Sequence, residues 1–283
     1  MTINLMCGMI GVQANQREAV ELAHRHGFES VEAMAGDLAR MSADQVKELL
    51  ATMTQKNVVF GAAGLPVDFR GEQGKFENDL AGLPRLAAGL QRARVQRIGT
   101  WLMPGHNTLT YRQNFRQHVE RLRKVAEILR DHELKLGLEY VGTKTLRDRF
   151  RYTFVYTMAE TKELIGEIGT GNVGFIMDSW HWWNAGESAD DILTLKGSDV
   201  VAVDLNDAPA GIPKDEQQDG RRELPLATGV IPAKEFLRAL QKIGCEAPVR
   251  AEPFNRALNE LDNDAACAKT AEALRKAFGT IAA

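Results

Sequence analysis

The chain has 283 residues, 44% of them hydrophobic, and a formal net charge of -3. That length suffices for one large hydrophobic core, and the near-neutral charge argues against a general nucleic-acid-binding protein, which usually carries a basic stripe. Three widely spaced cysteines (Cys7, Cys245 and Cys267) predict neither a disulfide framework nor a cysteine-type zinc site. The N-terminal residues do not match a signal peptide and no apolar run approaches the roughly 18 residues of a membrane span, so we expect a cytoplasmic protein that does not enter a membrane.

Short apolar runs alternate with helical patterns along the whole chain. The predicted strands cover residues 3–9, 30–33, 58–63, 97–102, 135–140, 173–178, 200–205 and 248–254. The helices predicted between and after them cover residues 16–26, a segment that begins at Ser42, and residues 75–93, 111–132, 158–168, 189–195, 233–243 and 264–278.

Eight alternating strand–helix units predict a parallel sheet, and eight units in a chain of this length predict a closed (β/α)8 TIM barrel. We expect it to form a single domain over residues 1–283. An open, doubly wound sheet is the alternative, but no G-x-G-x-x-G motif follows the first predicted strand. The connection over residues 206–228 is longer than most in such barrels, which makes it a candidate lid.

Carboxylates stand at or near the ends of several predicted strands. They are Glu32, Glu139, Asp178, Asp204 and Glu252, with Asp207 three residues after Asp204. Because the active site of such a barrel lies at the C-terminal ends of its strands, we expect them to converge. Their repulsion is tolerable if a divalent cation binds them or if some are protonated, and oxygen ligands favour Mg²⁺ or Mn²⁺ over zinc. The alternative of a helix cap or rim charge suits Asp207 well and Glu32 moderately, and a helix cap is open for Asp178.

Five segments resemble the xylose-isomerase-like sugar isomerase/epimerase superfamily, and within it the inosose isomerases and ketose 3-epimerases. They are GLEYVG (137–142), NVGFIMDSWHWWNAG (172–186), VVAVDLNDAP (200–209), RRELPLATGVI (221–231) and VRAEPFN (249–255). The likeness covers the second half of the chain in order and spacing, whereas the first half matches only as alternating strands and helices. These motifs are specific for the superfamily and poorly specific for the substrate.

The resemblance implies four metal ligands, which in that family are a Glu, an Asp, a His and a Glu. Glu139, Asp178 and Glu252 match three of them, but Asp204 stands where the family has its histidine. An aspartate can still bind a divalent ion, and it makes the site more typical of Mn²⁺ or Mg²⁺, with Co²⁺ and Zn²⁺ as alternatives. The departure could also weaken metal binding or alter the chemistry; we favour a retained metal.

The resemblance also implies catalytic and substrate-binding roles. Glu139 and Glu252 match two acid/base carboxylates that remove and return a proton beside a sugar carbonyl, while the cation stabilises the enediolate. The expected substrate contacts are His181, Arg222, Trp101 and Glu32. His181 could instead support Asp178, Arg221 could replace Arg222, either arginine could be a solvated charge, and Trp101 and Trp180 could equally be core residues.

The sequence therefore predicts a metal-dependent isomerase or epimerase of a small keto-sugar or polyol, in a homodimer or homotetramer and without nucleic acid. A first alternative is a lyase or dehydratase that acts on a keto-inositol or 3-keto-glycoside by the same enolisation. A second is a non-catalytic, metal-free barrel. An endonuclease-IV-like enzyme is disfavoured, because its trinuclear zinc site needs several histidines and only His181 is suitably placed.

Overall fold

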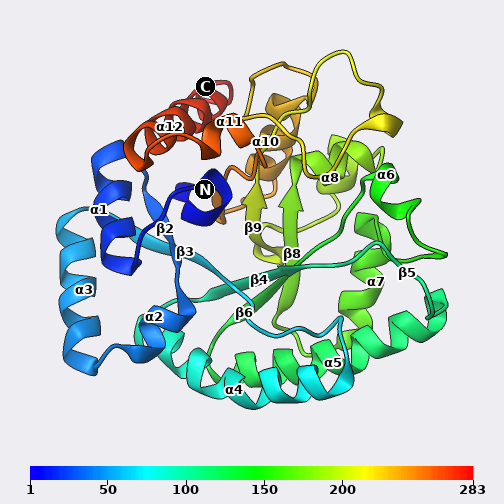
Figure 1. Cartoon of the computed structure of the whole chain (residues 1–283), viewed down its shortest axis with the longest axis horizontal. Helices are drawn as coiled ribbons and strands as arrows, with labels where there is room; N and C mark the ends of the chain where they lie inside the picture. Colours follow the sequence, from blue (N-terminus) through cyan, green and yellow to red (C-terminus); the bar gives the residue numbers. More distant parts are fainter. Residues whose placement is uncertain (283) are drawn as a thin grey trace.

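A closed barrel of eight parallel strands forms the centre of the computed structural model, which describes residues 1–282 (Figure 1). The order around the barrel is β1-β10-β9-β8-β6-β4-β3-β2, so each strand pairs with its neighbours in the sequence and β10 closes the ring on β1. The predicted (β/α)8 barrel is confirmed. The strands are β1 (Thr2–Leu5), β2 (Ser30–Ala33), β3 (Val59–Gly64), β4 (Arg97–Trp101), β6 (Lys135–Glu139), β8 (Val173–Asp178), β9 (Val200–Asp204) and β10 (Pro248–Arg250).

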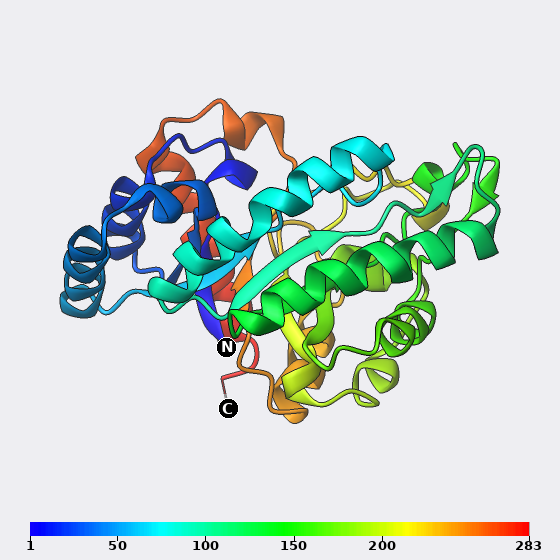
Figure 2. The same ribbon diagram turned by 90° about the horizontal axis from the view of Figure 1, so that it is seen from below.

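Helices surround the barrel, and the long neighbours α4 and α5 lie side by side along one flank (Figures 1 and 2). The longer helices are α1 (Gln16–His26), α3 (Ala43–Gln55), α4 (Gln73–Arg92), α5 (Tyr111–Asp131), α7 (Met158–Ile168), α10 (Ala233–Lys242) and α12 (Asn263–Gly279). Within residues 1–282 no helix has both the length and the apolar character needed to cross a bilayer.

Several short elements lie in the connections. They are the α-helices α2 (Ala35–Arg40), α6 (Lys144–Arg147), α8 (Ser179–Asn184), α9 (Ala189–Ile192) and α11 (Arg256–Asn259), the 3-10 helices η1 (Cys7–Ile10), η2 (Gly197–Asp199) and η3 (Lys214–Glu216), and the strand pair β5 (Gly105–His106) and β7 (Tyr152–Thr153).

Local capping explains why some helix boundaries follow directly from the sequence. The side chain of Asn15 accepts hydrogen bonds from the backbone at the start of α1, and Glu18 binds back to the Asn15 amide, which forms a capping box. Gly27 ends the helix with φ 73°, a conformation that glycine adopts without strain. Thr157, Glu160 and Gly169 act in the same way on α7. The predicted ranges 16–26 and 158–168 match these helices.

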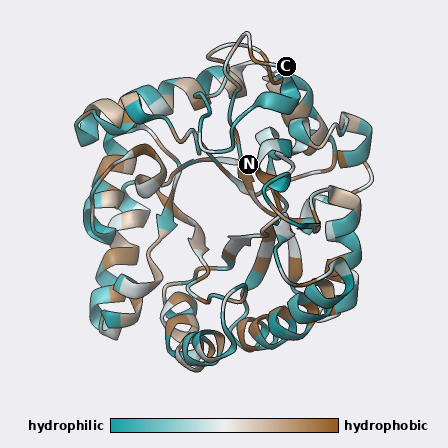
Figure 3. Cartoon of the chain, turned by 45° about the vertical axis from the view of Figure 1, so that its right-hand side comes forward, coloured by the Kyte–Doolittle hydropathy of each residue, from teal (hydrophilic) through white to brown (hydrophobic). Residues whose placement is uncertain are grey.

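The hydrophobic core has two layers, one between strands and helices and one inside the barrel. Apolar residues concentrate on the strands and on the inner faces of the helices, whose outer faces are hydrophilic (Figure 3). Inside the barrel, Ile176 fills the space beside two glycines. A Cβ atom added at Gly137 would lie 2.8 Å from Ile176 Cγ1, and one at Gly99 would lie 2.5 Å from Ile176 Cδ1. This close packing fills the interior below the carboxylates that end the strands.

Two strands end four residues before their predicted limits. The first ends at Leu5, because residues Cys7–Ile10 form a 3-10 turn that Gly11 closes with φ 77°. The last ends at Arg250, so that Glu252 lies two residues beyond the strand instead of within it. The sequence analysis also had no helix at residues 179–184, where α8 follows β8 without a loop.

Candidate active site

Four buried carboxylates meet at the C-terminal end of the barrel. Glu139, Asp178 and Asp204 are the last residues of β6, β8 and β9, and Glu252 follows β10. Asp178 lies opposite Asp204 in the strand register. Carboxylate oxygens of Glu139, Asp204 and Glu252 all lie within 4.8 Å of one another. A second group within the same limit joins Glu139 and Asp178 to His181. The convergence expected from the sequence is therefore present for all four.

Asp178 both caps a helix and belongs to this cluster. Its Oδ1 accepts hydrogen bonds from the backbone amide of Trp180 at 2.8 Å and from Nδ2 of Asn206 at 3.1 Å. Its Oδ2 accepts one from Nη1 of Arg222 at 2.8 Å. The capping bond starts α8 directly at the end of β8, and this helix carries His181 into the site.

His181 is buried with its ring among the acidic groups. Its Nδ1 lies 3.3 Å from the amide nitrogen of Gly142, and its Nε2 lies 3.6 Å from Asp178 Oδ2 and 3.7 Å from Glu139 Oε1. Burial lowers the pKa of His181 to about 4, so the ring is neutral at pH 7. Nη2 of Arg222 lies 3.2 Å from Nε2, so each ring nitrogen faces an N–H donor, and the neutral ring accepts from one of the two while its other nitrogen carries the proton.

Arg222 brings a positive charge into the cluster from the 206–228 connection. Nη1 donates to Asp178 and to Glu252 Oε2 at 3.0 Å, and Nη2 donates to Asp219 at 3.1 Å. Burial alone would lower the pKa of Arg222, but Asp178 and the other carboxylates raise it, so the group stays charged. Its neighbour Arg221 is exposed, so Arg222 is the arginine that lies in the site.

Arg250 is a site residue that the sequence analysis missed. Its Nε and Nη2 donate to the two oxygens of Asp204 at 2.5 and 3.0 Å, and both side chains are buried. The two residues are partners in the β10–β9 register, so the strands themselves set the pair. A signal was available, because Arg250 lies two residues before Glu252 within the predicted strand 248–254, where side chains at this spacing are expected to point to the same face.

Burial and like charges perturb the acidic groups strongly. Burial, and then the charge of Glu252, raises the pKa of Glu139 well above its usual range. Burial and the charge of Asp204 raise the pKa of Glu252 to about 8. The four carboxylates at the strand ends face two buried arginines, which leaves two negative charges without compensation, and Asp219 adds a further one nearby. Such an excess is relieved by protonation or by a bound cation.

The donor set fits a divalent cation. Carboxylate oxygens are the ligands that Mg²⁺ and Mn²⁺ prefer. Among residues 1–282, Oε1 of Glu139 is buried and has no hydrogen-bond partner, so this oxygen is available as a ligand. The neutral ring of His181 lies close enough to contribute to such a site.

The remaining predicted residues lie around the mouth or support it. Trp101 is 38% exposed and lies opposite Glu139 in the β4–β6 register, with the guanidinium of Arg70 over its ring. Trp180 is fully buried and donates from Nε1 to Thr143, which makes it a packing residue. Glu32 accepts a hydrogen bond from the amide of Cys7 at 2.8 Å, and its pKa is raised by burial.

Asp207 organises the long connection. Its carboxylate accepts hydrogen bonds from the backbone amides of Ala208, Thr228, Gly229 and Ile231, at distances of 2.7 to 3.0 Å. Its backbone pairs with that of Glu223. Asp207 therefore has a structural role in the connection, but as a buried acceptor of loop amides and not as the expected helix cap or rim charge. The 206–228 connection places Asp219 and Arg222 at the mouth.

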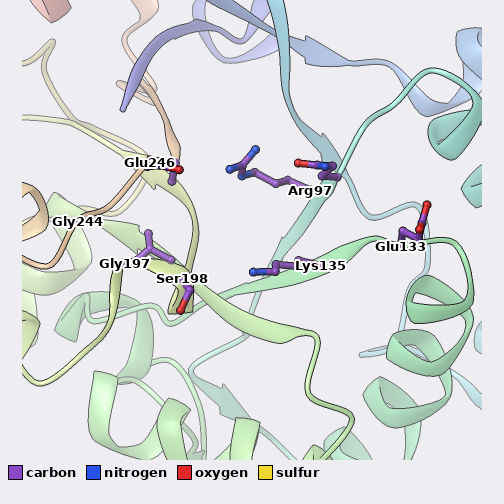
Figure 4. A pocket seen from close by; sticks show the side chains of 10 residues that line it. Arg97, Glu133, Lys135, Gly197, Ser198, Gly244 and Glu246 are labelled. Carbon is purple, nitrogen blue, oxygen red and sulfur yellow. The ribbon is translucent and has the colours of Figure 1, made fainter.

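A cavity of about 410 Å³ lies at the opposite end of the barrel, where β4, β6 and β9 begin. Figure 4 shows Arg97 and Lys135 on one side of it and Ser198 and Glu246 on the other. It is remote from the carboxylates, and this end of such barrels generally serves stability.

Comparisons with known proteins agree with the barrel fold. The family model for the xylose isomerase-like TIM barrel matches residues 20–277. An inosose isomerase from Bacillus subtilis (strain 168) is 27% identical over 139 residues, which are 48% of this chain and 46% of that protein. The chain thus matches about half the length of this relative.

Two solved structures are similar over nearly the whole chain. A xylose isomerase domain protein from Alicyclobacillus acidocaldarius subsp. acidocaldarius has a TM-score of 0.83 and 29% identity, with 96% of each chain covered. The IOLI protein with a bound zinc atom has a TM-score of 0.80 and 19% identity, with 98% of each chain covered. At that identity the second likeness concerns the fold alone.

Proposed function

The chain belongs to the xylose isomerase-like TIM barrel family, and from this premise we propose that it is a metal-dependent isomerase or epimerase of a small keto-sugar or polyol. The observation that carries the proposal is the cluster of four buried carboxylates at the barrel mouth, in which Glu139 keeps an unpaired oxygen. The similarity to an inosose isomerase supports a substrate of this class.

The cluster would hold a divalent cation through Glu139 together with Asp178 and His181, or through Glu139 together with Asp204 and Glu252; Asp204 also forms an ion pair with Arg250. A cation bound there would polarise the carbonyl and hydroxyl oxygens of the substrate. Mn²⁺ or Mg²⁺ suits the oxygen ligands best.

Glu139 and Glu252 are the proposed acid/base pair. Burial and neighbouring carboxylates raise the pKa of both, which favours their protonated forms. A cation bound beside them would favour the ionised form, so that one could act as the base and the other as the acid. The ionised carboxylate removes the proton on the carbon beside the carbonyl, which yields the enediolate of the substrate. In an epimerase, a protonated carboxyl returns a proton to the same carbon with opposite stereochemistry. In an isomerase, the proton goes to the neighbouring carbon and a hydroxyl proton passes between the two oxygens, so that the carbonyl changes position.

Other side chains would orient the sugar. Nε2 of His181 faces the carboxylates and Arg222, so the ring would hydrogen-bond a substrate hydroxyl that reaches this point. Arg222 keeps its guanidinium between Asp178 and Glu252 and holds these two side chains in place. The half-exposed ring of Trp101 is suited to contact the apolar face of the sugar.

The test is solvent deuterium exchange with Mn²⁺-loaded protein and a panel of inososes and ketoses. We expect deuterium at the carbon beside the carbonyl, and a loss of more than about 100-fold in Glu139→Gln and in Glu252→Gln. Glu216→Gln, an exposed change in the same long connection, serves as the control and should exchange normally. Wild-type rates in either of the first two variants would refute the assigned pair, and release of a β-substituent from the substrate would make the enzyme a lyase.

A further inference from the structure

The two arginines of the site hydrogen-bond to the carboxylates in different ways. Arg222 divides single hydrogen bonds among Asp178, Glu252 and Asp219, so no one of them is neutralised by it alone. Arg250 instead binds both oxygens of a single carboxylate, Asp204. This two-point geometry matches the planar guanidinium to the carboxylate and gives a strong, directional pair.

The Asp204–Arg250 pair is also the more rigid of the two arrangements. Both members belong to paired strands of the barrel and lie opposite each other, whereas Arg222 lies in a long connection. Asp204 is fully buried, and within residues 1–282 Arg250 is the one side chain that donates to its oxygens. If the carboxylate of Asp204 bound a metal ion instead of Arg250, the guanidinium of Arg250 would stay buried without its partner and beside a second cation. This would cost much free energy.

We propose that the Asp204–Arg250 ion pair takes the place of a metal ligand, so that the cation is held by the group of Glu139, Asp178 and His181 and not by Asp204. The inference rests on the proposed function, because it assumes a metal at the mouth. It assigns Asp204 a positioning role: Asp204 holds the guanidinium of Arg250 at the end of β10, two residues before the acid/base residue Glu252.

Mn²⁺ titration calorimetry on the metal-stripped full-length protein tests this inference. The decisive variant is the double change Asp204→Asn and Arg250→Gln, which removes the pair and leaves the net charge of the site unchanged. We expect it to bind one Mn²⁺ per chain, with a dissociation constant that rises by about 10- to 100-fold at most, as for a group that does not touch the metal. Asp178→Asn is the matched comparison and should lose far more affinity. Circular dichroism and a thermal melt check that each variant is folded.

A single change gives a second, independent readout. Arg250→Met frees the carboxylate of Asp204 and removes a positive charge from the site, so Mn²⁺ should bind more tightly than in the wild type, by about tenfold or more. Equal or weaker binding in this variant contradicts the inference. So does a loss in the double variant as large as that of Asp178→Asn. A wild-type protein that binds no Mn²⁺ would overturn the proposed function itself, and the inference with it.

Discussion

Replacement of Arg222 by methionine tests the electrostatics of the site most directly. The guanidinium donates to Asp178 at 2.8 Å, to Glu252 at 3.0 Å and to Asp219 at 3.1 Å, and it is buried. Methionine keeps much of the volume but leaves these carboxylates without their shared cation. Removal of one partner from a buried ion pair typically costs about 3–5 kcal/mol, because the remaining charge stays desolvated. We expect a loss of this size in the free energy of unfolding, measured by urea denaturation in the presence of EDTA.

Arg221→Met is the matched control for this experiment. Arg221 is exposed, and exposed substitutions of this kind usually change stability by less than about 0.5 kcal/mol. Saturating Mn²⁺ should restore part of the stability that Arg222→Met loses, because a bound cation compensates the same carboxylates. Equal stability of the two variants would refute the view that Arg222 holds the acidic cluster together.

Three further changes probe the surroundings of the site. Burial lowers the pKa of His118 from 6.5 to about 4. The neutral ring therefore contributes fully to stability above pH 6.5, and this contribution is lost as the pH falls toward 4. Between pH 7 and pH 5 the free energy of unfolding, measured in urea, should fall by about 2 kcal/mol more in the wild type than in His118→Phe. Asp207→Ala deprives four backbone amides of their acceptor and should cost about 2 kcal/mol or more, with faster tryptic cleavage of the 206–228 connection. Gly142→Ala would place a Cβ atom 2.3 Å from the carbonyl oxygen of His181, and thermal denaturation should show a loss of about 1–3 kcal/mol.

Matched controls accompany these changes. Asp215→Ala alters an exposed residue of the same connection and should leave the tryptic cleavage rate as it is in the wild type. Gly166→Ala adds a methyl group in α7 with no heavy atom within 4 Å, and it should be neutral or stabilising by about 0.5–1 kcal/mol. Identical pH profiles for the wild type and His118→Phe would show that this ring is not held neutral by the fold.

The sequence by itself determined the elements whose boundaries depend on neighbouring residues. α1 and α7 begin and end where predicted, because capping boxes and left-handed glycines act within a few residues of the helix ends. Asp178 at the end of an apolar run was sufficient to predict a carboxylate at the C-terminal end of a strand. The barrel followed from the regular alternation of strands and helices, since each unit must bury one face of its helix on the sheet.

Only the tertiary structure decided which charges meet. The pair of Asp204 with Arg250 depends on the register between two strands whose contacting residues are far apart in the sequence. The choice of Arg222 over its neighbour depends on the path of a long connection, which Asp207 holds by backbone hydrogen bonds. Local patterns specify which residues are polar and where strands end. The partner of a buried charge is selected by the packing of the whole barrel, because the electrostatic free energy depends on three-dimensional distance and burial.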